Sequence, residues 1–332
     1  MDILDTSAIR GLKKDDIHAI AQRRDVGVSP ISVYEILCHL DEQKKGETRE
    51  QAFARRRGMV GKMRGLQILD EPHTQHAIAV GAQSLADPTR FEDRDIANRM
   101  IEEVVQASNL ADLSKRTITL TDGRQAAFGA LAASTRVVLE AEVKQHADDV
   151  QKMWSAMQKL SSASSPADLT DKDLWEWLKA TVIAHTRSYE HDGVLEDHLL
   201  GKVTRSLFAY HGYLFARLRK YTRNSAGELE VPANDTEDGY ICMHLDLLEE
   251  DVLVTGDANT IDALAAALDI WNKHGPSEIA PACAVMSIEQ YKNTLDRLSS
   301  PVADHLPVYV LCFVWLVAVV LLVAIITEFA SR

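Results

Sequence analysis

The segment DVLVTGDANTIDALAAAL (residues 251–268) decides the fold class predicted for this chain of 332 residues. Residues 251–257 are a short aliphatic and β-branched run that ends at Gly256 and Asp257, a pattern typical of a buried strand. Residues 258–268 are rich in Ala and Leu and predict a helix. A buried strand that leads directly into a helix is the repeating unit of a parallel α/β sheet.

Other parts of the chain repeat this unit. Short apolar runs predict four more strands, at residues 2–5, 26–29, 66–69 and 282–287. Helical patterns are found between or after them, at residues 31–40, 47–63 and 288–298. The alternation predicts a parallel sheet that is flanked by helices on both faces.

The alternation stops between residues 89 and 234, where the sequence predicts helices only. Residues 123–160 are Ala-rich and almost free of helix breakers. We therefore expect one α/β domain in two parts, 1–88 and 235–300, interrupted by an all-α insertion. Two unrelated neighbouring domains are the alternative, but each α/β part alone has too few strands to bury a sheet.

Composition limits the possible functions. The formal net charge is −13, with 49 acidic and 36 basic residues, so nucleic acid could bind only at local basic patches. Four cysteines in 332 residues exclude a disulfide scaffold, and the absence of a CxxC pair excludes a zinc ribbon. A reducing compartment is the simplest interpretation. The 46% of hydrophobic residues excludes a disordered chain.

The segment LPVYVLCFVWLVAVVLLVAIIT (residues 306–327) predicts a transmembrane helix, because it is uncharged over about the 20 residues that span a bilayer. A buried core helix is the alternative, but such a helix normally keeps one polar face. The first residues contain acids and no apolar signal segment. We therefore expect a single-pass C-terminal membrane anchor, with the rest of the chain in the cytoplasm.

Four carboxylates are predicted to lie at one edge of the sheet. Asp5 and Asp257 end strands, whereas Glu35 and Asp238 lie early in helices that begin at the same carboxyl edge. A single Asp at such a position is usually a helix cap or a solvated charge. Four of them together would repel one another, and a divalent cation would relieve this repulsion. Mg²⁺ or Mn²⁺ is expected, because both prefer carboxylate oxygen.

Three blocks that carry these residues resemble the PIN domain, the metal-dependent nuclease fold of bacterial toxin ribonucleases and eukaryotic RNA-processing nucleases. The blocks are ILDTSAI (3–9), VSPISVYEIL (28–37) and DGYICMHLDLLEEDVLVTGD (238–257). The resemblance covers roughly residues 1–85 and 235–298, and neither the insertion nor the tail, so a toxin role does not transfer with it. It implies catalytic metal ligands at Asp5, Glu35, Asp238 and Asp257, and supporting hydroxyls at Thr6 and Thr255.

The third carboxylate has alternatives. Asp238 is preferred because Ile241, Leu245 and Leu248 follow it at helical spacing, which places it at the top of a buried face. The other candidates nearby are Asp235, Glu237 and Asp246.

Two basic segments are candidates for binding nucleic acid. Residues 51–65 contain no acid, and their charges could contact phosphates or form a solvated helix face; they are Arg55, Arg56, Arg57, Lys62 and Arg64. Residues 210–224 combine basic side chains with aromatic rings that could stack on bases or pack in the core. The pair His73 and His76 lacks the glutamate of a zinc-protease helix, so zinc is not expected.

Together these features predict a membrane-tethered, metal-dependent endonuclease that hydrolyses phosphodiester bonds, with RNA as the favoured substrate. One alternative is a non-catalytic PIN-like protein that binds a protein partner through the helical insertion. Another is a structure-selective DNA nuclease. Pairing of two chains through the membrane segment would give a homo-oligomer.

Overall fold

The structure is a computed structural model that describes residues 1–79, 92–161, 163–187, 197–276 and 280–299. The chain divides into two compact units, residues 1–288 and 289–332. The described residues of the second unit all belong to one helix, α13 (Ile288–Ser299). None of the helices that the structure describes is long and apolar enough to span a membrane. The membrane anchor predicted at residues 306–327 lies outside the described residues.

A five-stranded parallel sheet forms the centre of the first unit, in the order β3-β2-β1-β6-β7. The prediction of five parallel strands is confirmed. The sheet pairs Ile3 with Gly27 on one side and with Leu253 on the other, so β1 is central. The strands are β1 (Asp2–Leu4), β2 (Val26–Val28), β3 (Gln67–Ile68), β6 (Val252–Thr255) and β7 (Ala284–Ser287).

The direction in which the chain adds strands reverses between β1 and β6. Strands β2 and β3 extend the sheet to one side of β1, and β6 and β7 extend it to the other side. In open α/β sheets, ligands bind in the crevice beyond the carboxyl ends of the strands at such a reversal. Asp5 follows β1 and Gly256 follows β6, so both lie beside this crevice.

Helices flank the sheet, as predicted. The first part contributes α1 (Thr6–Gly11), α2 (Lys14–Ala21), α3 (Pro30–Leu37), α4 (Arg49–Met63) and α5 (Pro72–Ala79). The second part contributes α11 (Asp235–Cys242) and α12 (Ala258–His274). The prediction that one helical face continues from Asp238 to Leu248 is wrong in its second half. Helix α11 ends at Cys242, and Leu248 is 38% exposed.

The segment between the two parts is mainly helical, but the expectation of an all-α insertion is wrong. Strands β4 (Thr117–Thr119) and β5 (Gln125–Ala127) form an antiparallel hairpin. Its turn contains Gly123 at φ +85°, a backbone conformation that glycine adopts without strain. The long helix therefore begins at Phe128 and not at Gly123. The helices are α6 (Glu92–Gln106), α7 (Leu110–Leu113), α8 (Phe128–Leu160), α9 (Asp171–Arg187) and α10 (Asp197–Leu218), with a short 3₁₀ turn at Pro166–Asp168.

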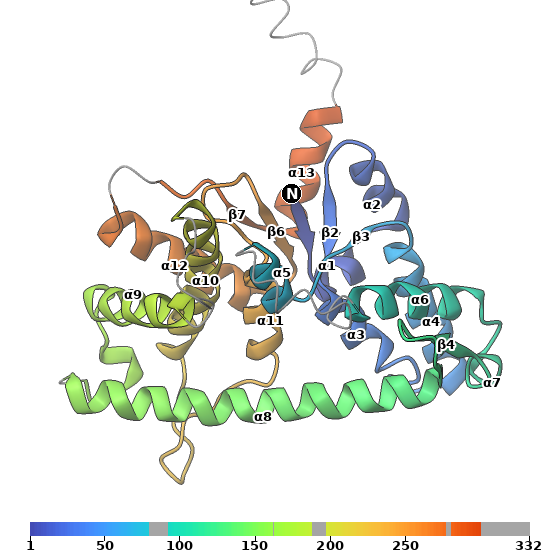
Figure 1. Cartoon of the computed structure of the whole chain (residues 1–332), viewed down its shortest axis with the longest axis horizontal. Coiled ribbons are helices and arrows are strands. Elements are labelled where there is room, and N and C mark those ends of the chain that lie inside the picture. Colours follow the sequence, from blue (N-terminus) through green and yellow to red (C-terminus); the bar gives the residue numbers. More distant parts are fainter. Residues whose placement is uncertain (80–91, 162, 188–196, 277–279, 300–332) are drawn as a thin grey trace, which may run out of the picture. The chain divides into compact units, whose positions relative to one another are not determined.

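Helices of this middle segment share one hydrophobic core with the sheet. Helix α10 packs along both α9 and α12. A Cβ atom at Gly212 would lie only 2.9 Å from the Cβ of Ala267, so the glycine allows α10 and α12 to approach closely. Helix α8 contacts both α3 and α11, and Figure 1 shows it passing both helices. The middle segment thus contacts the elements that carry Glu35 and Asp238.

Candidate functional site

Asp5 lies directly after β1 and forms the N-cap of α1. Its Oδ1 accepts a hydrogen bond from the backbone N–H of Ala8 at 2.6 Å, a role in which aspartate is favoured. The side chain is buried, with 4% of the residue exposed. Burial raises the pKa of Asp5, and hydrogen bonds from Thr255, Ala8 and Ser7 lower it in part. The carboxylate is therefore fixed in place but costly to ionise.

Two hydroxyl groups join Asp5 to the end of β6. The Oγ1 of Thr255 donates to Asp5 Oδ2 at 2.6 Å, as expected for a supporting hydroxyl. The Oγ of Ser7 lies 2.8 and 2.9 Å from the two carboxylate oxygens of Asp5 and accepts from the N–H of Gly256. These bonds connect the two central strands across the crevice.

Ser7, and not Thr6, supplies the second supporting hydroxyl. The Oγ1 of Thr6 is buried and has no hydrogen-bond partner among the described residues. The signal for Ser7 was its position two residues after Asp5, in the first turn of a capped helix.

Asp238 and Asp257 meet at one hydroxyl group. The Oγ1 of Thr260 lies 2.9 Å from Asp238 Oδ2 and 3.2 Å from Asp257 Oδ2. Asp257 is the N-cap of α12 and accepts from the N–H of Asn259 at 2.9 Å. Burial, followed by the charges of Asp5, Asp257 and Asp235, raises the pKa of Asp238 to about 7 against the hydrogen bond from Thr260. The structure therefore brings three of the four predicted carboxylates together.

Glu35 lies at the margin of this group. Its Oε1 accepts from Arg10 Nη2 at 2.8 Å, and its side chain is 25% exposed. Its charge contributes to the raised pKa of Asp5. Glu237 is nearby as well, since burial and then the charges of Glu35 and Glu142 raise its pKa to about 7. Sequence reasoning missed Arg10, whose partner lies on a different helix.

Two of the alternatives for the third carboxylate bind arginines. Asp235 is 1% exposed and accepts from Arg217 Nε at 3.0 Å and from the hydroxyl of Tyr221 at 2.5 Å. Asp246 accepts from Nε and Nη2 of Arg205 at 2.7 and 2.9 Å. Both carboxylates are thus engaged in structural ion pairs, and Asp238 is the member of the set that faces Asp5 and Asp257.

The raised pKa of Asp238 makes stability depend on pH. Between about pH 4, the usual pKa of aspartate, and about pH 7, the folded chain binds a proton at Asp238 that the unfolded chain has lost. Stability should therefore fall as the pH rises through this interval. Denaturant unfolding followed at several pH values should show a smaller fall for Asp238→Asn than for the unchanged protein. An equal fall in the free energy of unfolding of both proteins would contradict a raised pKa at Asp238.

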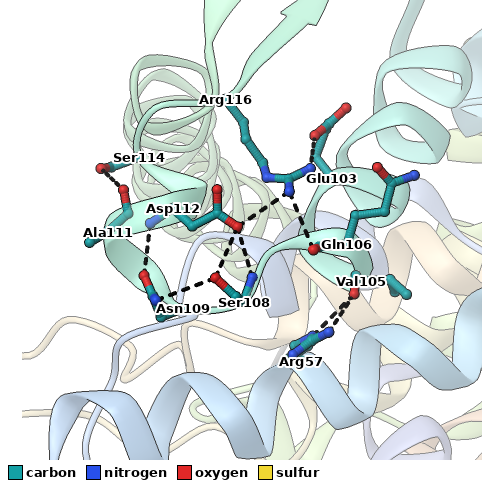
Figure 2. A network of polar contacts seen from close by, with 10 residues as sticks. All are labelled: Arg57, Glu103, Val105, Gln106, Ser108, Asn109, Ala111, Asp112, Ser114 and Arg116. Carbon is teal, nitrogen blue, oxygen red and sulfur yellow. Dashed lines mark hydrogen bonds and ion pairs between the residues drawn. The ribbon is translucent and has the colours of Figure 1, made fainter.

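The basic side chains of the predicted nucleic-acid patch contact other parts of the protein. Arg57 donates to the backbone oxygen of Val105 at 2.7 Å (Figure 2), and Arg56 is only 7% exposed. Lys62 donates to backbone oxygens at and after the end of α1, including that of Ile9. Arg55 and Arg64 pair with Glu47 and Glu102 at 2.9 Å. Arg55, Arg56 and Arg64 therefore have acidic partners, whereas Arg57 and Lys62 donate to uncharged backbone oxygens. Binding of nucleic acid at this patch stays a prediction.

The second basic and aromatic segment belongs to the core, which was the alternative interpretation. Tyr213, Phe215 and Tyr221 are buried. Arg217 is also buried and pairs with Asp235, so these groups are not available for stacking with bases. His76 is buried too, and the side chain of His73 lies outside the described residues.

The group of Asp5, Asp238 and Asp257 suits a hard divalent cation in its chemistry, because all its donors are carboxylate oxygens. Among the residues that the structure describes, no three His, Cys, Asp or Glu side chains are arranged to hold a metal ion together. Mg²⁺ is commonly held by one or two carboxylates, with waters and substrate phosphates as its other ligands. The pair that meets at Thr260 fits this mode.

No family model matches the chain, and no curated protein or solved structure is significantly similar to it.

Proposed function

We propose that this chain is a metal-dependent phosphodiesterase that cleaves nucleic acid, with RNA as the favoured substrate. The observation that carries the proposal is the gathering of Asp5, Asp238 and Asp257 at the strand-order reversal of a parallel sheet. Negative charge is concentrated there and partly buried, and a bound divalent cation would relieve it. The resemblance of the surrounding sequence blocks to the PIN domain supports the same function.

Each carboxylate has a distinct support. Asp238 and Asp257 would hold the cation from the side of Thr260. Asp5, which Ser7 and Thr255 fix in place, would add its negative charge beside this pair. Glu35, paired with Arg10, would lie at the margin of the group. When bound, the cation lowers the pKa of water and stabilises charge on the phosphate. The segment 306–327, as a membrane anchor, would confine this activity to a cytoplasmic membrane surface.

Cleavage should require added Mg²⁺ or Mn²⁺ and should stop in excess EDTA, because the bound cation would lower the pKa of the attacking water and stabilise charge on the phosphate. Attack by water should leave 5′-phosphate and 3′-hydroxyl ends on a labelled oligonucleotide. Restoration of cleavage by fresh Mg²⁺ controls for damage by the chelator. Undiminished cleavage in EDTA, or a 2′,3′-cyclic phosphate product, would contradict the proposed mechanism.

Single-stranded RNA and DNA of the same base sequence, tested in parallel, identify the substrate. Faster cleavage of RNA would support the favoured assignment, whereas cleavage of DNA alone would replace it with a DNA nuclease. A thermal shift with Mg²⁺ adds a readout that needs no substrate. Mg²⁺ should raise the melting temperature of the unchanged protein, because a ligand that binds only the folded state stabilises it.

A further inference from the structure

Thr260 lies in the first turn of α12, at the position from which a side chain reaches back toward the N-cap of the helix. The N-cap is Asp257, and only 2% of Thr260 is exposed. Its hydroxyl therefore lies inside the protein, between the start of α12 and helix α11, which carries Asp238. A buried hydroxyl takes its hydrogen-bond partners from the protein around it.

The hydroxyl of Thr260 has a preferred acceptor. A threonine hydroxyl carries one proton, so it donates to one carboxylate at a time. Its Oγ1 lies 2.9 Å from Asp238 Oδ2 and 3.2 Å from Asp257 Oδ2, and only the first distance is usual for an O–H···O bond. Asp257 is also held by the N–H of Asn259. The main acceptor is therefore Asp238.

The two oxygens of the Asp238 carboxylate differ in their surroundings. Oδ2 accepts from Thr260, and it also lies 3.4 Å from Nδ2 of Asn234 and 3.5 Å from the hydroxyl of Tyr213. None of the residues that the structure describes donates a hydrogen bond to Oδ1. The protein thus holds one oxygen of this carboxylate and leaves the other for a ligand.

We infer that Thr260 is a positioning residue of the proposed metal site: its hydroxyl holds Oδ2 of Asp238 and thereby leaves Oδ1 free for a divalent cation. This inference rests on the proposed function. Without the hydroxyl, the carboxylate of Asp238 would lose its shortest hydrogen bond, and ordering it would oppose binding of the cation. Removal of a group that orients a metal ligand typically lowers metal affinity by about 10–100-fold.

Thr260→Val is the direct test, because valine has the branched shape of threonine and lacks the hydroxyl. The measurement is binding of Mn²⁺ to the full chain, followed by the electron paramagnetic resonance signal of the free ion, and it needs no nucleic acid. We expect the dissociation constant for Mn²⁺ to rise by about 10–100-fold in Thr260→Val. Thr260→Ser, which keeps the hydroxyl, should bind Mn²⁺ nearly as well as the unchanged protein.

Thr236→Val is the matched control. Thr236 lies on α11, two residues before Asp238, and is 3% exposed, so its side chain is as enclosed as that of Thr260. Its Oγ1 has no hydrogen-bond partner among the described residues. The same chemical change at this position should leave Mn²⁺ binding unchanged. Melting temperatures of both variants in EDTA measure the structural cost of each substitution apart from the metal.

Cleavage at increasing Mn²⁺ separates a positioning residue from a ligand. Thr260→Val should regain most of its cleavage rate at high Mn²⁺, because a weakened site can still be filled by mass action. Asp238→Asn should not regain it, because that variant has lost a charged ligand. A cleavage rate of Thr260→Val that stays low at every Mn²⁺ concentration would contradict the positioning role.

The outcomes distinguish this inference from the proposed function. If the unchanged protein binds no Mn²⁺, the proposed function fails and the inference fails with it. If the unchanged protein and Thr260→Val bind Mn²⁺ equally well, only the role of Thr260 is overturned. Equal loss in Thr236→Val, or weak binding in Thr260→Ser, would indicate an effect of packing and would also overturn it.

Circular dichroism shows whether each variant retains the fold. If Thr260→Val does not fold, Thr260→Cys replaces it, because a thiol is only a weak hydrogen-bond donor. Thr260→Cys should then bind Mn²⁺ more weakly than Thr260→Ser. Equal binding by these two variants would overturn the inference.

Discussion

Asp5→Asn should reduce cleavage by more than roughly 100-fold and leave the protein folded, since loss of a group that merely orients a metal ligand already costs about 10–100-fold. Asparagine caps a helix about as well as aspartate, so the bond from Ala8 can be kept. Burial already disfavours the ionised form of Asp5, so a neutral side chain should cost little stability. Initial cleavage rates and melting temperature, measured on the same sample, test both parts.

Asp262→Asn is the matched control for this prediction. Asp262 lies on α12, its side chain is 67% exposed, and its partner is Lys220 at 3.2 Å. This variant should cleave normally, because an exposed ion pair contributes little to stability and the residue is not part of the carboxylate group. Full activity of Asp5→Asn would show that the carboxylate group is not the catalytic centre. Equal loss in both variants would indicate a nonspecific effect of charge.

Asp235→Ala should lower the free energy of unfolding by about 3–5 kcal/mol, because it leaves the buried charge of Arg217 without its counter-ion. Both side chains are almost fully enclosed, with 1% of Asp235 and 7% of Arg217 exposed. The substitution also removes the acceptor of the Tyr221 hydroxyl. Urea unfolding monitored by tryptophan fluorescence would show the change as a large shift of the midpoint.

The double variant Asp235→Ala/Arg217→Met separates the ion pair from packing. It should recover part of the lost stability, since removal of both charges leaves no buried charge unpaired. A double variant that is no more stable than Asp235→Ala alone would contradict the ion-pair explanation. Asp235 and Asp238 are three residues apart on α11, yet we expect one to act on stability and the other on cleavage.

The strands of the sheet could be predicted from the sequence because each is a short apolar run with a strand-ending residue after it. Asp5 and Asp257 followed directly from these strand ends, since parallel strands bring their carboxyl ends to one edge. The hairpin at residues 117–127 was missed although Asp122 and Gly123 form a common turn pair. Its three-residue strands are shorter than the alternation needed to recognise a strand.

What could not be predicted depends on partners that are distant in sequence. The basic run at residues 55–64 contains no acid, but its counter-charges come from Glu47 and Glu102. Likewise, Asp235 resembles Asp238 in the sequence and differs because Arg217 of α10 reaches it. The sequence does not distinguish Thr260 from many other polar residues, because its contact with Asp238 depends on how α12 packs beside α11. Spacing along the chain describes one face of one helix, whereas these contacts depend on how helices pack.

The pairing of β1 with β6 has a consequence for when the protein can become active during its synthesis. Asp5 and Thr255, which share a hydrogen bond, are 250 residues apart in the chain. At about 5–20 residues per second, ribosomes need on the order of tens of seconds to make the second partner after the first. During that time the nascent chain holds Asp5 without the strand, hydroxyls and carboxylates that complete the group. The carboxylate group therefore assembles only after nearly the whole α/β domain has been translated, so no activity that depends on it can begin while the first 250 residues are being made.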